Sequence, residues 1–361
     1  MAPEFSILCF MNPTANSSST ELQIETPLCP VFGTCGGCTY QHLSYAEELR
    51  VKEQQLHGLF KTELKLPWEV FESIVASPKH YHYRNRLDLE MRRSQRQIMM
   101  GFQSPELRKV VPVSSCAIAM EEISDFMPQL EMEAAEKLPE NYRTANLVVR
   151  CGDDGRVFWG GIGRRSLEMK EEDFLWTEVN GRRVYYSLET FFQANLSILP
   201  RVMEIIRSLL PWDQDTLFLD LYSGVGLFGI CLADLVGKVV MVEECPGSIK
   251  LAKYNIHYHQ LSHVEMMPGK VENELPKLTE QAFRKIYAMI DPPRAGLSRQ
   301  VAESLSASRL IKGLLYLSCH PQSLVRDLKI FIEKGWKVEK IHPFDFFPRT
   351  RHLETLVLLT P

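Results

Sequence analysis

The spacing of apolar residues changes near residue 189, and this change predicts two halves of different construction. Upstream, residues 45–60 have helical periodicity behind Ser44 as the expected N-cap, and residues 81–113 alternate between apolar and polar as antiparallel strands do. A further helix is expected at 120–137, with strands at 147–151 and 157–159. The first half is therefore predicted to be α+β.

Downstream of residue 189, short apolar runs alternate with helical stretches, which is typical of a parallel sheet covered by helices. Strands are expected at 216–221, 238–243, 263–267, 286–290, 312–318, 336–341 and 354–359. The predicted fold class is α/β, with a C-terminal Rossmann-like sheet and an N-terminal α+β domain. The expected divisions are a flexible tail at 1–26 and two domains at 27–187 and 188–361.

Composition narrows the class of protein only a little. The chain has 361 residues, of which 45% are hydrophobic and 24% charged, as in ordinary globular proteins. The formal charge of -4 gives no global signal for nucleic acid, so any such surface must be local. There is no apolar run of membrane-spanning length and no basic leader, so we expect a cytoplasmic protein without a membrane partner. Nine cysteines, an odd number, favour thiols, metal binding or catalysis over disulfides.

Two short strings near the end of the chain place reactive side chains at the ends of predicted strands. Cys319 follows the apolar run 313–317, and Pro321 then prevents the strand from continuing. Glu354 stands directly before the apolar run 355–359. Ligands of open α/β sheets bind at the carboxyl ends of strands, so this thiol is placed to act on a ligand. A thiol nucleophile and a carboxylate base at one sheet edge indicate covalent catalysis.

A glycine turn after the first strand of the second half predicts a nucleotide-like cofactor. Gly224 and Gly226 let the backbone approach a ligand, and with Gly229 they also match dinucleotide spacing, which alone is a weak signal for NAD. Asp220, just before the turn, would repel a pyrophosphate but suits a cationic sulfonium and ammonium. Glu243, at the end of the next strand, can accept hydrogen bonds from both ribose hydroxyls. These carboxylates favour S-adenosylmethionine.

Two further residues fit the same cofactor. In the turn Asp291-Pro292-Pro293 the prolines hold the Asp291 carboxylate over the sheet edge, and such turns occur in several methyltransferase classes. Gln193 precedes a predicted helix, where its side chain could hydrogen-bond the cofactor or equally cap the helix.

A cysteine-rich loop predicts a second cofactor. Cys29, Cys35 and Cys38 lie in one loop whose glycine pair lets three sulfurs turn toward one point. Cys116 is the best candidate for a fourth ligand, because Cys151 stands inside an apolar strand and resembles a core thiol. A close triplet suits an iron–sulfur cluster better than zinc, which usually takes two closely spaced pairs. The spacing is not the Cys-x3-Cys-x2-Cys of radical enzymes, so the cluster is expected to be structural or sensing.

Several of these motifs carry a resemblance to a known family. They are Phe191-Phe192-Gln193, the turn at 220–226, Asp291-Pro292-Pro293-Arg294, Ser318-Cys319 and Phe347-Pro348-x-Thr350-x-His352-x-Glu354. With them, residues 29–361 resemble the RNA uridine-5-methyltransferase family. The resemblance implies that Cys319 adds to C6 of a uracil and that Glu354 removes the C5 proton. It also implies cofactor contacts from Gln193, Tyr222, Glu243 and Asp291. Cys29, Cys35, Cys38 and Cys116 match the 4Fe–4S ligands of the ribosomal-RNA branch.

The expected partner is RNA, and the cluster favours 23S ribosomal RNA over transfer RNA. The chain is expected to lack the N-terminal TRAM barrel of many relatives and to act as a monomer. Phe344, Phe346 and Phe347 could stack on bases, or equally be core residues. A basic surface is expected from Arg84, Arg86, Arg92, Arg93, Arg96 and Arg108, which as a plainer interpretation are solvated strand positions.

Two alternatives belong to other functional classes. An adenine or protein methyltransferase could use the Asp291 turn, and Cys319 would then be structural. A non-catalytic iron–sulfur protein that binds RNA or senses redox state would not bind S-adenosylmethionine.

Overall fold

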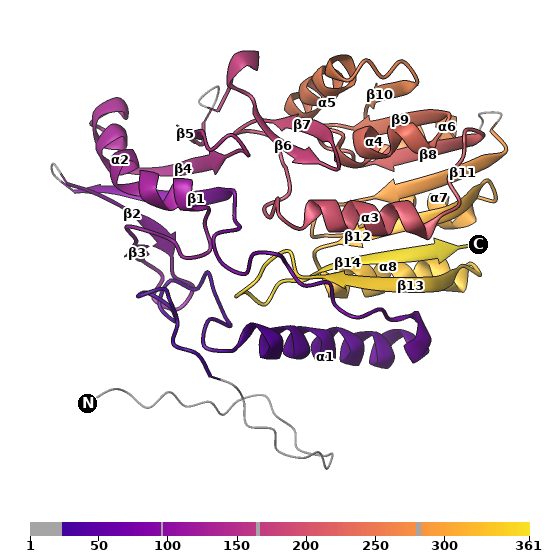
Figure 1. The fold of residues 1–361 in the computed structure, drawn as a ribbon, viewed down its shortest axis with the longest axis horizontal. Helices are drawn as coiled ribbons and strands as arrows, with labels where there is room; N and C mark the ends of the chain where they lie inside the picture. The colour runs from indigo at the N-terminus through magenta and orange to yellow at the C-terminus, as the bar shows by residue number, and fades with distance from the viewer. Residues whose placement is uncertain (1–23, 95–96, 164–166, 279–282) are drawn as a thin grey trace, which may run out of the picture.

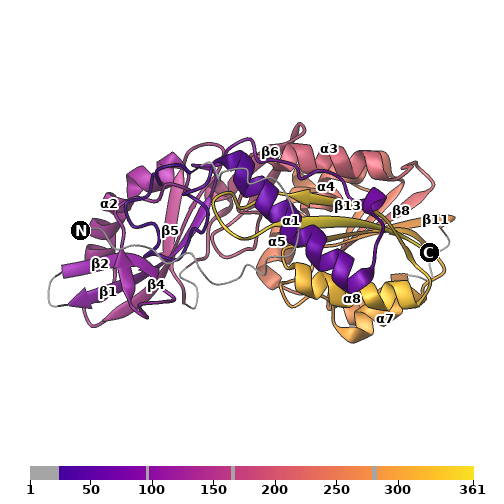
Figure 2. The same ribbon diagram turned by 90° about the horizontal axis from the view of Figure 1, so that it is seen from below.

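Two lobes make up the molecule in the computed structural model, which describes residues 24–94, 97–163, 167–278 and 283–361, and a long helix runs along the second lobe (Figures 1 and 2). The first lobe is an antiparallel sheet in the order β3-β2-β1-β4-β5, with helix α2 against one face. Its elements are β1 Arg86–Ser94, β2 Gln97–Gln103, β3 Val110–Pro112, α2 Glu121–Lys137, β4 Thr144–Cys151 and β5 Val157–Gly161. This lobe confirms the α+β prediction for the first half.

Alternation explains why this sheet has one covered face. Leu87, Leu89 and Met91 of β1 are buried at every second position, while Asp88 between them is exposed. They share a core with apolar residues of α2, including Ile123. The period of two therefore turns one face of the sheet toward the helix and leaves polar side chains on the other.

The second lobe is built on a seven-stranded sheet in the order β10-β9-β8-β11-β12-β14-β13. Its strands are β8 Thr216–Leu221, β9 Lys238–Glu243, β10 Val264–Pro268, β11 Lys285–Ile290, β12 Ile311–Ser318, β13 Lys337–Phe344 and β14 Glu354–Thr360. All expected strands of this sheet are present. Only β14 runs opposite to its neighbours, so the sheet is mixed rather than wholly parallel.

Helices cover both faces of this sheet (Figure 1). One face carries α3 Leu199–Leu209, α4 Leu227–Leu232, α5 Pro246–Tyr258 and the hairpin of β6 Leu175–Val179 and β7 Arg182–Tyr186. The other carries α1 Tyr45–Leu64, α6 Val271–Leu278, α7 Arg299–Ala307 and α8 Pro321–Glu333. Short 3-10 turns lie at Trp68–Val70, Glu171–Asp173 and Ala233–Leu235. Because both faces are covered, β8 is buried at every position, which explains its largely apolar sequence.

Helix α1 belongs by its packing to the second lobe, although sequence reasoning assigned it to the first domain. Ser44 caps it as expected, its Oγ accepting the Glu47 amide at 3.3 Å. Leu56 and Phe60 then enter the core beneath the sheet. Figure 2 shows the helix running from the first lobe along the second, beside α8. Within the described ranges, no helix combines the length and apolar character needed to cross a membrane.

Candidate active site

Cys319 and Glu354 meet at the edge of the sheet where β12 ends and β14 begins. Ser318 of β12 pairs with Thr355 of β14 in antiparallel register. Continuing that register by one residue places Cys319 opposite Glu354. The reversed direction of β14 is what brings the start of this strand to the carboxyl end of β12.

Both side chains line one cavity of about 580 Å³. Its other lining residues are Arg84, Arg86, Asp88, Glu189, Phe191, Phe192, Gln193, Ala194, Arg294, Phe347 and His352. Cys319 is half-buried, whereas Glu354 is 5% exposed and its buried Oε2 has no hydrogen-bond partner among the described residues. A buried carboxylate oxygen without a partner is costly, so this atom is poised for a group that enters the cavity.

The electrostatics of the cavity favour the protonated form of both groups. Burial, followed by repulsion from Glu354 and Asp291, raises the pKa of Cys319 to about 12. Burial, with repulsion from Asp291, raises the pKa of Glu354 well above its usual range. The Arg294 guanidinium acts in the opposite direction on both pKa values. A bound substrate that adds positive charge or removes water would therefore decide when each group ionises.

Next to this pair, the ends of β8, β9 and β11 gather three carboxylates. Burial raises the pKa of Asp220 to about 7, and Asp291 and Glu243 are near enough to raise it further. Burial likewise raises the pKa of Asp291 to about 7, partly offset by the amide of Gln193, which donates to Asp291 Oδ2 at 3.0 Å. None of the three forms an ion pair with a described residue within 4.0 Å. Three uncompensated carboxylates create a site that favours a cation.

The glycine turn is held by these same carboxylates. Glu243 Oε2 accepts the amide of Gly224 at 2.9 Å, and its Oε1 accepts the amides of Glu244 and Cys245. Gly226 has a φ of +91°, and a Cβ there would lie 2.8 Å from the sulfur of Met241. The turn therefore needs glycine at this position, because of its positive φ and the close approach of Met241.

The remaining predicted cofactor residues are placed differently from one another. Asp220 is 1% exposed and accepts the Gly229 amide at 2.8 Å, so it braces the turn and α4 from below instead of lining a cavity. Tyr222, with a φ of +62°, lines a neighbouring cavity of about 430 Å³ together with Glu243. Gln193 lines the cavity of Cys319 and Glu354.

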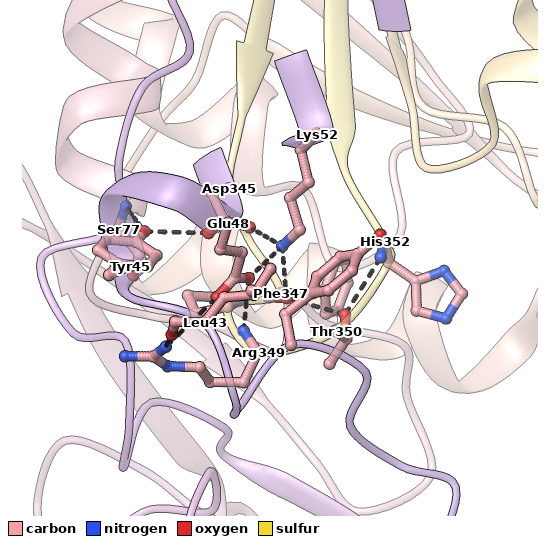
Figure 3. A network of polar contacts seen from close by, with 12 residues as sticks. Leu43, Tyr45, Glu48, Lys52, Ser77, Asp345, Phe347, Arg349, Thr350 and His352 are labelled. Carbon is pink, nitrogen blue, oxygen red and sulfur yellow. Dashed lines mark hydrogen bonds and ion pairs between the residues drawn. The ribbon is translucent and has the colours of Figure 1, made fainter. Parts of the chain in front are cut away.

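A buried ionic network anchors the loop that leads to Glu354 (Figure 3). Lys52 of α1 donates to Glu48 and to Asp345, each at 2.7 Å, and to the carbonyl of Phe347 at 3.1 Å. The amide of Arg349 donates to Glu48 at 2.7 Å. All four charged side chains are almost fully buried. Breaking one such pair would leave a buried charge unpaired, which costs about 3–5 kcal/mol, so helix and loop are firmly joined.

The four cysteines of the predicted cluster line one cavity of about 300 Å³ at the inner end of the first lobe. Burial raises the pKa of Cys38 to about 12, with further increases from Cys116, Cys29 and Cys35, so the thiols are close enough to repel as thiolates. Cys151 is buried elsewhere, its thiol directed to the Gly152 carbonyl at 3.3 Å. No three His, Cys, Asp or Glu side chains in the described part of the chain surround a single metal-ion position.

The glycine pair leaves room for the sulfurs of this cavity. Gly36 has a φ of +77°, and a Cβ there would lie 2.5 Å from Cδ of Pro105. A Cβ on Gly37 would lie 3.4 Å from the Cys35 sulfur. The same loop is tied to the network of Figure 3, because the amides of Thr39 and Tyr40 donate to the Arg349 carbonyl at 2.7 and 3.0 Å.

The structure changes two predictions about RNA contacts. Phe344 and Phe346 are 0% exposed and are core residues, so stacking on RNA by these rings is excluded. Phe347 lines the cavity that contains Cys319 and Glu354, which we call the catalytic cavity. Phe191 also lines it and is 68% exposed, but the sequence analysis did not propose it for stacking.

The expected basic surface is largely neutralised. Arg86 pairs with Asp88 and Arg92 with Glu90 on the same strand. Arg93 donates to four carbonyls around the end of α2. Arg84 and Arg86 line the catalytic cavity, while Arg108 takes no part in it. Arg96 lies outside the described residues.

Sequence reasoning missed Arg294, Arg351 and His352 as members of the site, although two of them lie within the quoted motifs. It also missed the network around Lys52 and Asp345. A signal existed for part of this network, since Glu48 and Lys52 stand four residues apart on one helix face and Asp345 interrupts an apolar run.

Comparisons with known proteins agree with this geometry. The family model described as tRNA (Uracil-5-)-methyltransferase matches residues 163–361, more than half of the chain. A 23S rRNA (uracil(1939)-C(5))-methyltransferase of Aliivibrio fischeri is 25% identical over 92% of this chain and 82% of its own length. An uncharacterised RNA methyltransferase of Caldanaerobacter subterraneus is 27% identical over 93% of this chain and 85% of its own length.

A solved structure shares the fold. The Pyrococcus abyssi tRNA (uracil-54, C5)-methyltransferase, in complex with S-adenosyl-L-homocysteine, superposes with a TM-score of 0.70 at 22% identity. The match covers 91% of this chain and 86% of that one, so both lobes and their arrangement are common to the two. Together with the family match over the sheet that carries Cys319 and Glu354, this assigns the chain to the tRNA (uracil-5-)-methyltransferase family.

Proposed function

We propose that this protein transfers a methyl group from S-adenosylmethionine to C5 of a uridine in RNA, through a covalent adduct between Cys319 and C6 of the uracil. The observation that carries the proposal is the pairing of Cys319 with Glu354 in one cavity, beside a group of uncompensated carboxylates. That arrangement offers a nucleophile, a base and a site for a cationic methyl donor at one sheet edge. An adenine or protein methyltransferase would need neither the thiol nor the unpartnered carboxylate oxygen.

The donor site is proposed at the ends of β8, β9 and β11. Asp291 accepts a hydrogen bond from Gln193, which lines the cavity of Cys319 and Glu354, and Glu243 and Tyr222 line the neighbouring cavity. Gly224 and Gly226 shape the turn between them, and Asp220 braces it. A sulfonium and an ammonium group carry the positive charge that these carboxylates lack.

The proposed reaction gives each catalytic residue one task. Uracil C5 is a weak nucleophile, so the Cys319 thiolate first adds to C6 and converts the ring into an enolate. C5 then attacks the sulfonium methyl, and S-adenosylhomocysteine leaves. Glu354 accepts the C5 proton, after which the C6–S bond breaks and the thiolate is restored. The target base must leave its stack to reach a half-buried thiol.

A 5-fluorouridine RNA tests the covalent step. Fluorine at C5 cannot leave as a proton, so the wild-type protein with S-adenosylmethionine should form an adduct that survives denaturation. Its Cys319→Ala variant should form none. If an RNA that is otherwise methylated gives no adduct when it contains 5-fluorouridine, the covalent mechanism is wrong.

The RNA that we propose as substrate is 23S ribosomal RNA, in the cytoplasm, with the protein acting as a monomer. The Aliivibrio fischeri relative, aligned over most of both chains, carries that substrate in its name. Transfer RNA is the second candidate, since the Pyrococcus abyssi enzyme acts on it. Methylation of total RNA from a deletion strain, followed by mapping of the modified uridine, separates the two.

We also propose that Cys29, Cys35, Cys38 and Cys116 hold a 4Fe–4S cluster. Each iron of such a cluster takes one thiolate, so its ligands surround a cavity, as these four residues do. The bound cluster would supply positive charge that lets buried thiols ionise. Anaerobically purified protein should be brown with about four irons per chain. Cys116→Ser should lose the iron and Cys151→Ser should keep it, whereas stoichiometric zinc without iron would overturn the assignment.

A further inference from the structure

A second cavity, of about 350 Å³, opens on the other side of Cys319. Its lining consists of Lys52, Gln55, Leu56, Leu59, Arg294, Cys319, His320, Pro321, Gln322, Arg351, His352 and Leu353. Cys319, Arg294 and His352 also line the catalytic cavity, so these three side chains form the boundary between the two spaces. Whatever occupies the second cavity therefore lies directly beside the uracil that Cys319 attacks.

The charged side chains that line this cavity are all positive. Arg294 and Arg351 are exposed, and their guanidinium groups make no hydrogen bond or ion pair with a described residue. Lys52 is already paired with Glu48 and Asp345 and is not available to a ligand. No carboxylate lines this space, in contrast to the catalytic cavity, which contains Asp88, Glu189 and Glu354.

The positive charges around this cavity affect His352, which lies on the boundary between the two cavities. Burial, and then the charges of Arg294, Arg351, Arg84 and Lys52, lower the pKa of His352 to about 4. The ring is therefore neutral at physiological pH and adds no further cation. Two free guanidinium groups beside a neutral imidazole make a setting that favours an anion, and guanidinium geometry matches phosphate oxygens.

The rest of the lining suits the remainder of a nucleotide. Leu56, Leu59 and Leu353 provide an apolar floor, and the exposed amides of Gln55 and Gln322 can donate to and accept from the edge of a base. The His320 ring is fixed because its Nδ1 accepts the Ser323 amide at 3.3 Å and contacts Ser323 Oγ at 2.8 Å. The volume falls within the roughly 300–1,000 Å³ range of small-ligand pockets.

We propose that this second cavity binds the nucleotide next to the target uridine, with its phosphate on Arg351 and its base read by Gln55 and Gln322. This inference rests on the proposed function, because it takes RNA as the substrate. It goes further by assigning sequence preference to residues outside the family motifs: Arg351 and Gln322 stand at positions that those motifs leave open, and Gln55 comes from α1. Helix α1 thus contributes to substrate choice as well as to the fold.

Arg351→Ala tests the phosphate contact. A phosphate contact to a single strand contributes a slope of about 0.7 to the dependence of log affinity on log salt concentration. We expect the affinity for a short oligouridylate, measured by fluorescence anisotropy at several salt concentrations, to fall about tenfold at low salt. The slope should flatten by about 0.7, as one lost phosphate contact predicts. S-adenosylmethionine affinity should stay at the wild-type value.

Arg309→Ala is the matched control. Arg309 precedes β12 and therefore lies at the edge of the sheet opposite to Cys319, so its loss removes the same charge from the same lobe. The slope of log affinity against log salt concentration for Arg309→Ala should equal that of the wild-type protein. If Arg351→Ala and Arg309→Ala give the same slope, Arg351 contacts no phosphate and the proposal is wrong.

Gln322→Glu tests the base contact without changing the size of the side chain. A carboxylate in the cavity should weaken RNA binding and shift the preference for the neighbouring base, read out by methylating a pool of transcripts randomised beside the target uridine. Gln214→Glu, before β8 at the far edge, should leave the preference unchanged. An unaltered preference in Gln322→Glu would sink the assignment.

Failure of the proposed function itself would have a different signature. Wild-type protein would then transfer no methyl group to any RNA, whichever residue occupies position 351. The anisotropy slopes do not depend on turnover, so they would still decide whether Arg351 contacts a phosphate.

Discussion

The two halves of the sheet edge that holds the active site carry opposite charge. At the ends of β8, β9 and β11, Asp220, Glu243 and Asp291 gather without a cation beside them. Around the junction of β12 and β14, Arg294 and Arg351 gather, and neither forms an ion pair with a described residue. Cys319 and Glu354 lie between the acidic half and the basic half. Each half lacks the charge that one of the two proposed substrates brings.

This division explains how one cleft can bind a cation and a polyanion side by side. In the acidic half, burial raises the carboxyl pKa values, and for Asp220 repulsion from Asp291 and Glu243 adds to it; a sulfonium would favour the ionised carboxylates. In the basic half, burial and then the charges of Arg294 and Arg351 lower the pKa of His352, and a phosphate would offset those charges. If the halves were mixed, their charges would neutralise one another and neither ligand would gain from entering.

Replacement of Cys319 should have the largest effect on methyl transfer and leave ligand binding to both halves intact. Cys319→Ala removes the atom that activates the uracil, so methyl transfer should fall to background. Affinity for S-adenosylmethionine by calorimetry, and for oligouridylate by anisotropy, should remain within about twofold, since the sulfur has no part in either charge contact. A variant that turned over at the wild-type rate would make the thiol structural and restore the alternative of another methyltransferase class.

Glu354→Gln should separate the steps of the reaction. Glutamine is nearly the same size but cannot accept the C5 proton, so addition and methyl transfer can proceed while release cannot. We expect product release to slow by about 10²–10⁴-fold, as loss of a general base predicts. A protein–RNA adduct that carries the new methyl group should accumulate, visible by mass spectrometry. Wild-type turnover would instead assign the base to another residue or to water.

Asp291→Asn should affect the acidic half alone. The amide keeps an oxygen that can accept from Gln193 but removes the charge, so affinity for S-adenosylmethionine should fall by about 2 kcal/mol, or roughly thirtyfold. Oligouridylate affinity should be unchanged, the reverse of the pattern expected for Arg351→Ala. Equal losses for both ligands would show that the two halves are not independent.

Affinity for S-adenosylmethionine measured over a pH series should test the acidic half further, and we expect a smaller effect. Because the pKa of Asp291 is raised to about 7, its carboxyl is protonated below that pH and ionised above it. The cationic donor favours the ionised form, so its affinity should rise between pH 6 and pH 8, by at most about tenfold per pH unit. S-adenosylhomocysteine lacks the sulfonium charge and should show a weaker rise. A flat profile for S-adenosylmethionine, measured by calorimetry, would contradict this account of the acidic half.

Much of the second lobe was predictable because its sequence signals are local. Strands such as β8 and β12 are buried on both faces along most of their length and are therefore largely apolar. The placement of Cys319 at the carboxyl end of β12 followed from the proline that stops the run. The reversal of β14 was not predicted, since a short apolar run has the same composition in either direction.

The basic half of the site was predicted far less well. Lys52 meets Asp345 across 293 residues, and no local pattern records such a contact. Phe344 and Phe346 were open candidates for stacking because an aromatic run looks the same whether it faces RNA or the core. The hairpin of β6 and β7 went unnoticed within a charged segment, where only a few positions, such as Val179 and Val184, are both apolar and buried.

The network in Figure 3 also ties together residues that are made at very different times. During synthesis Glu48 and Lys52 emerge 293 residues or more before Asp345 and Arg349 arrive to pair with them. Until then, docking α1 on the sheet would bury Lys52 before its partner Asp345 has been synthesised. Stable docking of the helix is therefore disfavoured. A chain interrupted before residue 345 would hold neither the catalytic loop nor a firmly seated first helix. Competence to modify RNA is thus withheld until translation is nearly complete, and an unfinished copy would be recognisable to proteases by its loose first helix.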